Sequence, residues 1–262
     1  MRTTVFHRLD ATNLMRRLAL GVWVALLGTT VYGGDIVVWS AGAAQTPLSI
    51  LIQDYQKTSS NTIAVEFAPV GVLVKRLADG GRPDVLIVSQ DALANVEKNA
   101  WSVPHTAAPI GRVGVGIAIK EGAPAPDIST PDALRQTLLN AKSLTYMDPT
   151  KGTSGKHFAS VLDQLGIAEQ VRAKTTLGDV GFVVEPVARG DIELGIQQIT
   201  EILPVKGAKL LGPLPDALQK ITVYVIALGA QTHDAVAARD FMTFVRSQRS
   251  QAVFVSSGFA AP

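Results

Sequence analysis

The chain of 262 residues contains no cysteine, which excludes a disulfide framework, a thiolate metal site, a cysteine nucleophile and a lipid anchor on cysteine. Charged residues make up only 18% and aromatic residues 6%. Basic and aromatic residues do not interleave, so no nucleic-acid-binding surface is expected. Hydrophobic residues make up 47%, which indicates a globular chain and excludes a disordered one.

The net charge of +2 originates in the amino-terminal segment. Arg2, Arg8, Arg16 and Arg17 precede a short apolar run at 18–27, and small residues follow it at 31–33. This pattern is typical of a cleavable signal peptide, which we expect over residues 1–33. If translation starts at Met15 instead of Met1, Arg16 and Arg17 with the apolar run still form a compact leader. The remaining chain carries 20 basic and 21 acidic residues and no second apolar run near the roughly 20 residues of a membrane span. We therefore expect a soluble exported protein.

Strand and helix patterns alternate through the mature chain. In the first half we expect strands at 35–40, 62–67, 84–89 and 112–120 and helices at 44–57, 72–78 and 93–99. A loop rich in proline at 122–126 separates a second series. There we expect helices at 130–141, 155–165, 180–189, 233–247 and 251–255 and strands at 143–147, 193–197 and 221–228. Apolar strands that alternate with helices predict an α/β fold with a parallel sheet covered on both faces.

The break at 122–126 and the late strand at 221–228 predict two α/β lobes. Two crossing strands, near 111–115 and 222–225, would join them. The first lobe would contain residues 34–112 and 225–262, and the second would contain residues 113–224. A ligand would lie in the cleft between the lobes, at the carboxyl ends of strands and the amino ends of helices.

Eight short segments follow one another in a distinctive order along the chain: 38–43, 67–73, 82–89, 148–149, 152–155, 187–190, 195–198 and 258–259. In this order and spacing they resemble the molybdate-binding-protein-like family, whose members are type II periplasmic solute-binding proteins of ABC importers. The resemblance covers essentially the whole mature chain. It implies a type II periplasmic binding protein fold, a periplasmic location and a small-molecule ligand, with an ABC permease as a partner if the protein is a transport binder.

The sequence also departs from the family members that bind tetrahedral oxyanions. The loop 69–71 after the second strand has no hydroxyl group, and Gln198 stands where the resemblance implies a tyrosine. A missing buried hydrogen-bond partner costs about 1–3 kcal/mol, so molybdate is not the expected ligand. The run 195–205 and the segment 211–215 resemble a subgroup that includes an enzyme interconverting cis- and trans-aconitate. The resemblance thus implies an isomerase of a small tricarboxylate. A binding protein for a small organic anion is the alternative.

The loop Gly152-Thr153-Ser154-Gly155 precedes a predicted helix. Free amides and the two hydroxyl groups at a helix amino end favour binding of an anion, although Ser154 could simply cap the helix. Lys151 and Lys156 flank this loop. Arg112, at the start of the crossing strand, could hold a carboxylate with two hydrogen bonds or be an exposed hinge charge.

Other binding residues follow from the resemblance, which places the loops after the strands at the cleft. These residues are Ser40, Ala41, Val70, Gly71, Val180 and Gln198. For the first four the alternative is ordinary turn chemistry. Tyr224, on the returning strand, could donate a hydrogen bond to the substrate or simply pack in the core.

An aconitate isomerase needs a general base and support for negative charge on the adjacent carboxylate, but no metal or redox cofactor. The candidate bases are His157 and Glu201, with Lys75 as a weaker third. His157 could instead be a half-buried helix residue, and Glu201 a surface carboxylate. His105 and His233 have no metal-ligand spacing around them, so no metal site is expected. We expect a monomer that is not inserted in a membrane after the leader is removed.

Overall fold

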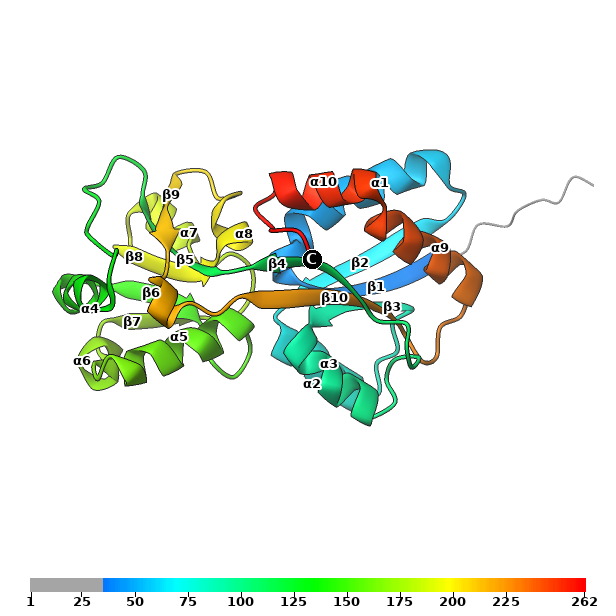
Figure 1. The fold of residues 1–262 in the computed structure, drawn as a ribbon, viewed down its shortest axis with the longest axis horizontal. Coiled ribbons are helices and arrows are strands. Elements are labelled where there is room, and N and C mark those ends of the chain that lie inside the picture. The colour runs from blue at the N-terminus through cyan, green and yellow to red at the C-terminus, as the bar shows by residue number, and fades with distance from the viewer. Residues whose placement is uncertain (1–34) are drawn as a thin grey trace, which may run out of the picture. The chain divides into compact units, whose positions relative to one another are not determined.

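Two five-stranded sheets organise residues 35–262, the part of the chain that the computed structural model describes (Figure 1). The predicted signal peptide lies outside the described residues. No helix within residues 35–262 is long and apolar enough to cross a membrane. The alternation of strands and helices expected from the sequence is confirmed as an α/β fold.

The first sheet has the strand order β2-β1-β3-β10-β4. Its strands are β1 (Asp35–Ala41), β2 (Thr62–Ala68), β3 (Val85–Ser89), β4 (Ala108–Val113) and β10 (Thr222–Leu228). Strands β1, β2 and β3 are parallel, whereas β10 runs antiparallel to both of its neighbours. Every residue of β3 is buried, as its uninterrupted apolar sequence predicts for a strand covered on both faces.

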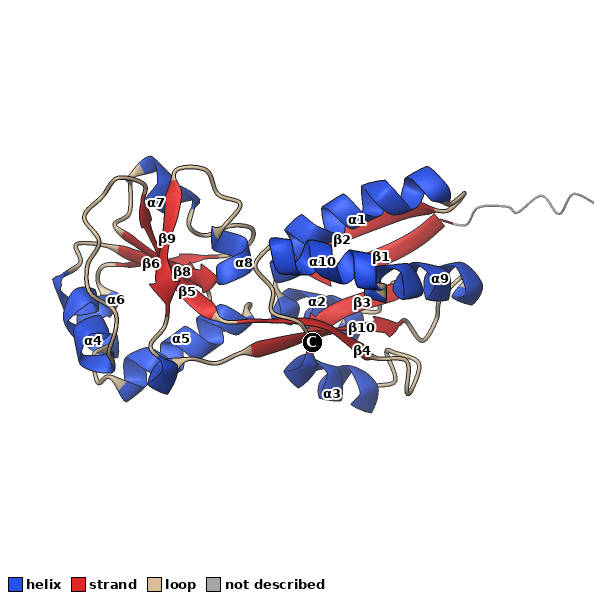
Figure 2. Cartoon of the chain, turned by 45° about the horizontal axis from the view of Figure 1, so that its top comes forward, coloured by secondary structure: helices blue, strands red, loops and turns tan. Residues whose placement is uncertain are grey.

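Helices cover both faces of this sheet. Helices α1 (Gln45–Thr58), α9 (Ala235–Arg246) and α10 (Gln248–Ser256) lie on one face, and α2 (Val70–Ala78) and α3 (Gln90–Lys98) on the other (Figures 1 and 2). A 3-10 turn, η1 (Gly42–Ala44), leads directly into α1. Helix α1 buries Leu48, Leu51, Ile52 and Tyr55, a spacing that places all four side chains on the core-facing stripe of one helix. We call this sheet and its helices the first lobe.

The second sheet has the strand order β7-β6-β8-β5-β9. Its strands are β5 (Val115–Lys120), β6 (Leu144–Met147), β7 (Thr175–Gly178), β8 (Leu194–Gln198) and β9 (Ala208–Pro213). Helices α4 (Pro131–Asn140), α5 (Thr153–Gln164) and α6 (Ala168–Arg172) lie on one face, and α7 (Glu185–Arg189) and α8 (Ile199–Ile202) on the other (Figure 1). Thr130 caps α4, because its hydroxyl accepts a hydrogen bond from the Ala133 N–H. We call this sheet and its helices the second lobe.

The chain passes between the sheets twice. The first passage is at Gly114, between β4 and β5, and the second is the segment 214–221, which contains the 3-10 turn η2 (Asp216–Leu218). The strand expected at 112–120 is therefore two strands, which belong to different sheets. The lobe limits expected from the sequence, 34–112 with 225–262 and 113–224, stay a prediction.

The helix expected at 180–189 is also shorter than predicted, since only Glu185–Arg189 is helical. Gly181 takes a φ of +70°, which belongs to the left-handed region and cannot continue a right-handed helix. Pro186 lacks an N–H group, so it suits the first turn, where that group has no partner inside the helix. The sequence did not predict β7 and β9. Neither strand contains a fully buried residue, so both lack the apolar pattern that reveals a strand.

Candidate functional site

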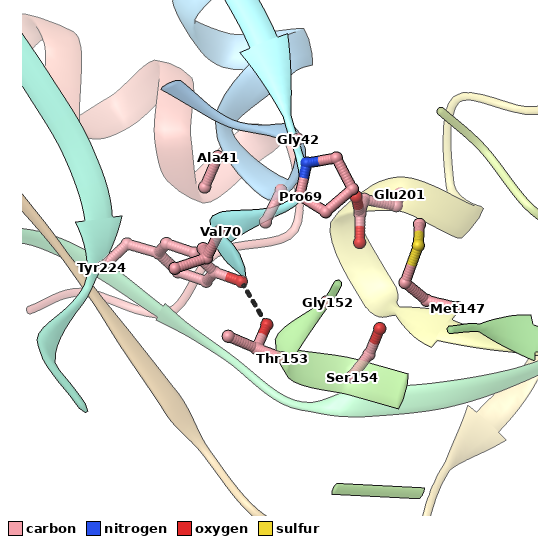
Figure 3. Close-up of a pocket in the computed structure, with 11 residues that line it drawn as sticks. Ala41, Gly42, Pro69, Val70, Met147, Gly152, Thr153, Ser154, Glu201 and Tyr224 are labelled. Carbon is pink, nitrogen blue, oxygen red and sulfur yellow. Dashed lines mark hydrogen bonds between the residues drawn. The ribbon is translucent and has the colours of Figure 1, made fainter. Parts of the chain in front are cut away.

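A small pocket lies between the two lobes, and we call it the inner pocket (Figure 3). From the first lobe it is lined by Ala41, Gly42, Ala43, Pro69, Val70 and Tyr224. From the second lobe it is lined by Met147, Gly152, Thr153, Ser154 and Glu201. Its volume is about 20 Å³, which is room for about one water molecule.

Three helical segments begin at the inner pocket. The turn η1 with α1 starts after Ala41, α2 starts after Pro69, and α5 starts after Gly152. None of these three starts has a side-chain cap. Within residues 35–262 the main-chain N–H groups of Thr153 and Ser154 have no acceptor. The amino ends of helices carry partial positive charge, and the Thr153 and Ser154 N–H groups add two free donors, so the pocket favours an anionic group.

Glu201 supplies the one carboxyl group in the lining of the inner pocket. It is the third residue of α8, and the nearby main-chain N–H of Gln198 and side chain of Gln197 lower its pKa. Gln198 is the cap residue of α8, so Glu201 has the position of the acidic residue in a capping box. Glu201 is only 8% exposed, and burial outweighs both effects and raises its pKa to about 8. The carboxyl group can therefore gain or lose a proton near neutral pH.

Tyr224 reaches the same pocket from β10 and joins a cross-lobe hydrogen-bond network. Its hydroxyl lies 3.2 Å from the Thr153 hydroxyl, and Figure 3 shows both oxygens beside the pocket. The Gln198 Nε2, which carries two protons, lies within hydrogen-bond distance of three hydroxyl groups: Tyr224 at 3.2 Å, Thr222 at 3.2 Å and Thr153 at 3.3 Å. Burial and the negative charge of Glu201 raise the pKa of the Tyr224 hydroxyl, so Tyr224 keeps its proton and can donate a hydrogen bond.

A larger cavity adjoins the inner pocket, and we call it the outer cavity. Its volume is about 470 Å³, and it shares Val70, Gly152 and Thr153 with the lining of the inner pocket. His157 lines the outer cavity and not the inner pocket. Its Nε2 lies 2.8 Å from the carbonyl oxygen of Leu218, so this nitrogen carries the proton and donates. Burial lowers the pKa of His157, the bond to Leu218 raises it, and the charge of Lys220 lowers it further; the net pKa is lower than usual.

The structure brings together most of the residues predicted for the site. The inner pocket contains Ala41, Val70, Thr153, Ser154, Glu201 and Tyr224, and the outer cavity contains Val70, Gly71, Thr153 and His157. Ser40 and Gln198 are buried beside the inner pocket without lining it. The Ser40 hydroxyl donates to the Ala41 carbonyl oxygen at 3.1 Å.

Arg112 and Val180 line neither the inner pocket nor the outer cavity. The Arg112 Nε donates at 2.9 Å to the carbonyl oxygen of Ala261, near the carboxyl end of the chain. Val180 is 68% exposed. Lys75, the weaker candidate base, forms an exposed ion pair with Asp79 and also lies outside both linings. These three side chains therefore have no contact with the site as it is built in this structure.

Sequence reasoning missed Met147 and Gln197. Met147 is the last residue of β6, and the rule that ligands bind at the carboxyl ends of strands would have indicated it. Gln197 directly precedes Gln198, the last residue of β8, so the same rule would have indicated it. Within residues 35–262, no group of three or more His, Asp or Glu side chains could hold a metal ion.

The chain matches one family model and several known proteins. A family model described as bacterial extracellular solute-binding protein matches residues 36–260. An aconitate isomerase from Pseudomonas sp is 28% identical over 229 residues, which cover 85% of this chain and 86% of the relative. The molybdate-binding protein ModA of Escherichia coli K12 is 21% identical over 229 residues, which cover 86% of this chain and 89% of ModA.

Solved structures show the same fold. The periplasmic molybdate-binding protein of Azotobacter vinelandii superposes with a TM-score of 0.73 at 14% identity, covering 87% of this chain and 99% of that chain. The expected fold, a type II periplasmic binding protein with two α/β lobes, is thereby confirmed. The family resemblance expected from the sequence is confirmed as well.

Proposed function

Because the chain belongs to the bacterial extracellular solute-binding protein family, we propose that it binds a small organic anion between its lobes and isomerises it. The proposed reaction interconverts cis- and trans-aconitate by moving a proton across an allylic system. The similarity to an aconitate isomerase over most of both chains supports this reaction. So does the loop 69–71 without a hydroxyl group, which offers fewer donors to a tetrahedral oxyanion.

The buried carboxyl group of Glu201 is the observation that carries the proposal. A general base works best when its pKa lies near the working pH, and burial raises the pKa of Glu201 to about 8. Glu201 also lies in the inner pocket, where the uncapped helix ends favour a substrate carboxylate. His157 has a lowered pKa and lines the outer cavity instead. We therefore assign the base to Glu201.

The proposed reaction has two proton transfers. The Glu201 carboxylate takes a proton from the methylene carbon of the substrate, and the electron pair spreads over the allylic carbons onto the adjacent carboxylate. The Glu201 carboxyl group then gives a proton to the other end of the allylic system, which leaves the double bond shifted by one position. The Thr153 and Ser154 N–H groups and the Tyr224 hydroxyl are the donors that would stabilise the charge between the two transfers.

The proposed location is the periplasm, after removal of the leader. The leader pattern at 1–33 and the family's description as extracellular support it. The proton shift moves no electrons to or from a cofactor, so the proposed chemistry requires no redox group. We propose that the mature protein acts as a monomer.

A solute-binding protein for a small organic anion is the second candidate function. The family match and the two adjoining cavities between the lobes favour it, because binding proteins of this kind close their domains around a ligand. In that function the partner would be an ABC permease. Glu201 in its protonated form would then donate a hydrogen bond to the ligand instead of removing a proton from it.

One assay separates the two functions. Purified protein without its leader is mixed with cis-aconitate or trans-aconitate, and conversion is followed by ultraviolet absorbance. The proposed isomerase approaches the same mixture of isomers from either side. If neither isomer is converted while aconitate raises the melting temperature of the protein, the isomerase proposal fails and the binding function stands.

A further inference from the structure

The two cavities between the lobes differ greatly in size. The inner pocket, at about 20 Å³, has room for about one water molecule, whereas the outer cavity, at about 470 Å³, lies within the roughly 300–1,000 Å³ of small-molecule sites. The cavities share the lining residues Val70, Gly152 and Thr153, so they lie next to each other. A molecule with three carboxylates cannot fit in the inner pocket alone, and most of it would occupy the outer cavity.

Basic side chains dominate the charge of the outer cavity. Lys151, Lys156 and Lys220 line it, together with a single carboxylate, Asp91. Lys220 pairs with Asp91 and Lys151 with Asp179, and the acidic partners are 73% and 69% exposed. Exposed ion pairs of this kind contribute little free energy, so a ligand carboxylate can replace the acidic partner at small cost.

Lys156 differs from the other two lysines because it forms no ion pair within the described residues. It lies in the first turn of α5, three residues after Thr153, which borders both cavities. His157 uses its Nε2 proton for the carbonyl oxygen of Leu218 and so offers no second proton to an anion. The lysines are therefore the cationic groups in this cavity that suit a carboxylate.

We propose that the outer cavity is a second carboxylate subsite, at which Lys156 and Lys220 bind the substrate carboxylates that do not enter the inner pocket. The identity of the substrate rests on the proposed function. Lys156 and Lys220 are the residues that would select this substrate. The subsite makes the protein prefer a tricarboxylate to a monocarboxylate of similar length. Since both lysines are exposed, the preference weakens as the salt concentration rises.

The test measures binding of unreactive ligands by calorimetry. The ligands are tricarballylate, a saturated tricarboxylate, and butyrate, a monocarboxylate. The proteins, all without the leader, are the wild type, Lys156→Gln, the double variant Lys156→Gln/Lys220→Gln, and the control Lys209→Gln. Lys209 is an exposed residue of β9 that lines neither cavity, and its substitution removes the same charge.

We expect Lys156→Gln to weaken tricarballylate binding about threefold to fivefold, the range that an exposed ion pair supports, and the double variant to weaken it further. Neither variant should change the affinity for butyrate. Lys209→Gln should leave the affinity for both ligands unchanged. Equal weakening by Lys156→Gln and Lys209→Gln, or no tricarballylate binding by the wild type, would overturn the subsite. The ligands do not react, so the binding measurement does not depend on turnover. If the protein fails to convert aconitate, the isomerase proposal fails, but the carboxylate subsite does not.

Discussion

Gly42 and Glu201 meet across the two lobes, and the absence of a side chain on Gly42 makes room for the Glu201 carboxyl group. A Cβ atom built on Gly42 would lie 2.7 Å from Glu201 Oε1, closer than such atoms approach in proteins. Gly42 starts the turn η1 in the first lobe, and Glu201 belongs to α8 in the second. The carboxyl group is therefore positioned, and removed from water, by a contact between the lobes.

Substitution Gly42→Ala should displace the Glu201 carboxyl group without unfolding the protein. The colliding atom is the far end of a flexible side chain, so the side chain can turn away at little cost in stability. We expect turnover of aconitate to fall at least about tenfold, because misplacing a catalytic group by about 1 Å costs up to about a hundredfold. The melting temperature should stay close to that of the wild type.

The matched control for this substitution is Gly212→Ala. A Cβ atom there would meet only Ile128 Cδ1, at an ordinary contact distance of 3.6 Å. We expect normal turnover from this variant. Equal turnover of Gly42→Ala and the wild type would show that the position of the Glu201 carboxyl group does not matter for the reaction.

The rate should depend on pH through the ionisation of Glu201. The base is the ionised carboxylate, and its pKa is raised to about 8, so kcat/KM should rise about tenfold per pH unit below that value and level off above it. The measurement is the initial rate of aconitate conversion between pH 6 and pH 9.5, a range chosen to bracket that pKa. A rate that is constant over this range would rule out a base with the pKa of Glu201.

Stability should depend on pH in the opposite sense. The folded pKa of Glu201, about 8, lies above the ordinary value of 4.5, so between these values the folded protein binds a proton that the unfolded chain releases. The stabilisation is complete below pH 4.5 and is lost as the pH rises to about 8. Each unit of difference corresponds to about 1.4 kcal/mol, so the loss amounts to a few kcal/mol.

Urea unfolding of the wild type and of Glu201→Gln at several pH values isolates this contribution. Glutamine has the size of glutamate without its titration, so the wild type should lose stability relative to the variant between pH 5 and pH 8, the interval set by the two pKa values. A constant difference between the two proteins across this interval would mean that burial does not raise the pKa of Glu201.

A second cross-lobe contact should control ligand affinity. The Gly71 N–H donates to the Lys151 carbonyl oxygen at 2.7 Å, and a Cβ atom on Gly71 would lie 2.7 Å from the same oxygen. Main-chain atoms cannot turn away, so Gly71→Ala should keep the lobes apart. Since Gly71 lies inside α2, alanine itself suits the helix and should not lower the stability of the free protein.

Calorimetry with tricarballylate and thermal unfolding test this substitution together. We expect affinity to fall at least about tenfold, which is about 1.4 kcal/mol of binding free energy, with an unchanged melting temperature of the free protein. Wild-type affinity in Gly71→Ala would show that the ligand does not require this contact between the lobes.

The sequence predicted the fold where the local pattern is strong. The apolar run of β3 and the capped start of α4 at Thr130 are visible in the residues themselves. The division of residues 112–120 at Gly114 is not visible, because two strands of similar character follow each other and only the sheet to which each belongs differs. Such a division depends on tertiary pairing, which a local pattern does not contain.

The same distinction holds for the site. The amino end of α5 at Thr153 and Ser154 was predicted from its glycine-rich loop, and Glu201 was a candidate on its chemistry alone. Two properties could not be predicted: the burial of Glu201 and its contact with Gly42, which lies 159 positions earlier. For Arg112, the sequence suggested a contact that the structure does not contain. Its charge suggested a hydrogen bond to the ligand, but its side chain donates to the main chain at Ala261.

The most direct measurement of the central claim is turnover by Glu201→Gln compared with His157→Gln. Each variant is first shown to bind tricarballylate by calorimetry, so that turnover alone is compared. Loss of a general base lowers turnover by about a hundredfold to ten-thousandfold, and we expect a loss of this size in Glu201→Gln and a loss of less than about tenfold in His157→Gln. If Glu201→Gln converts aconitate at the wild-type rate, Glu201 is not the base and the account of the inner pocket is wrong.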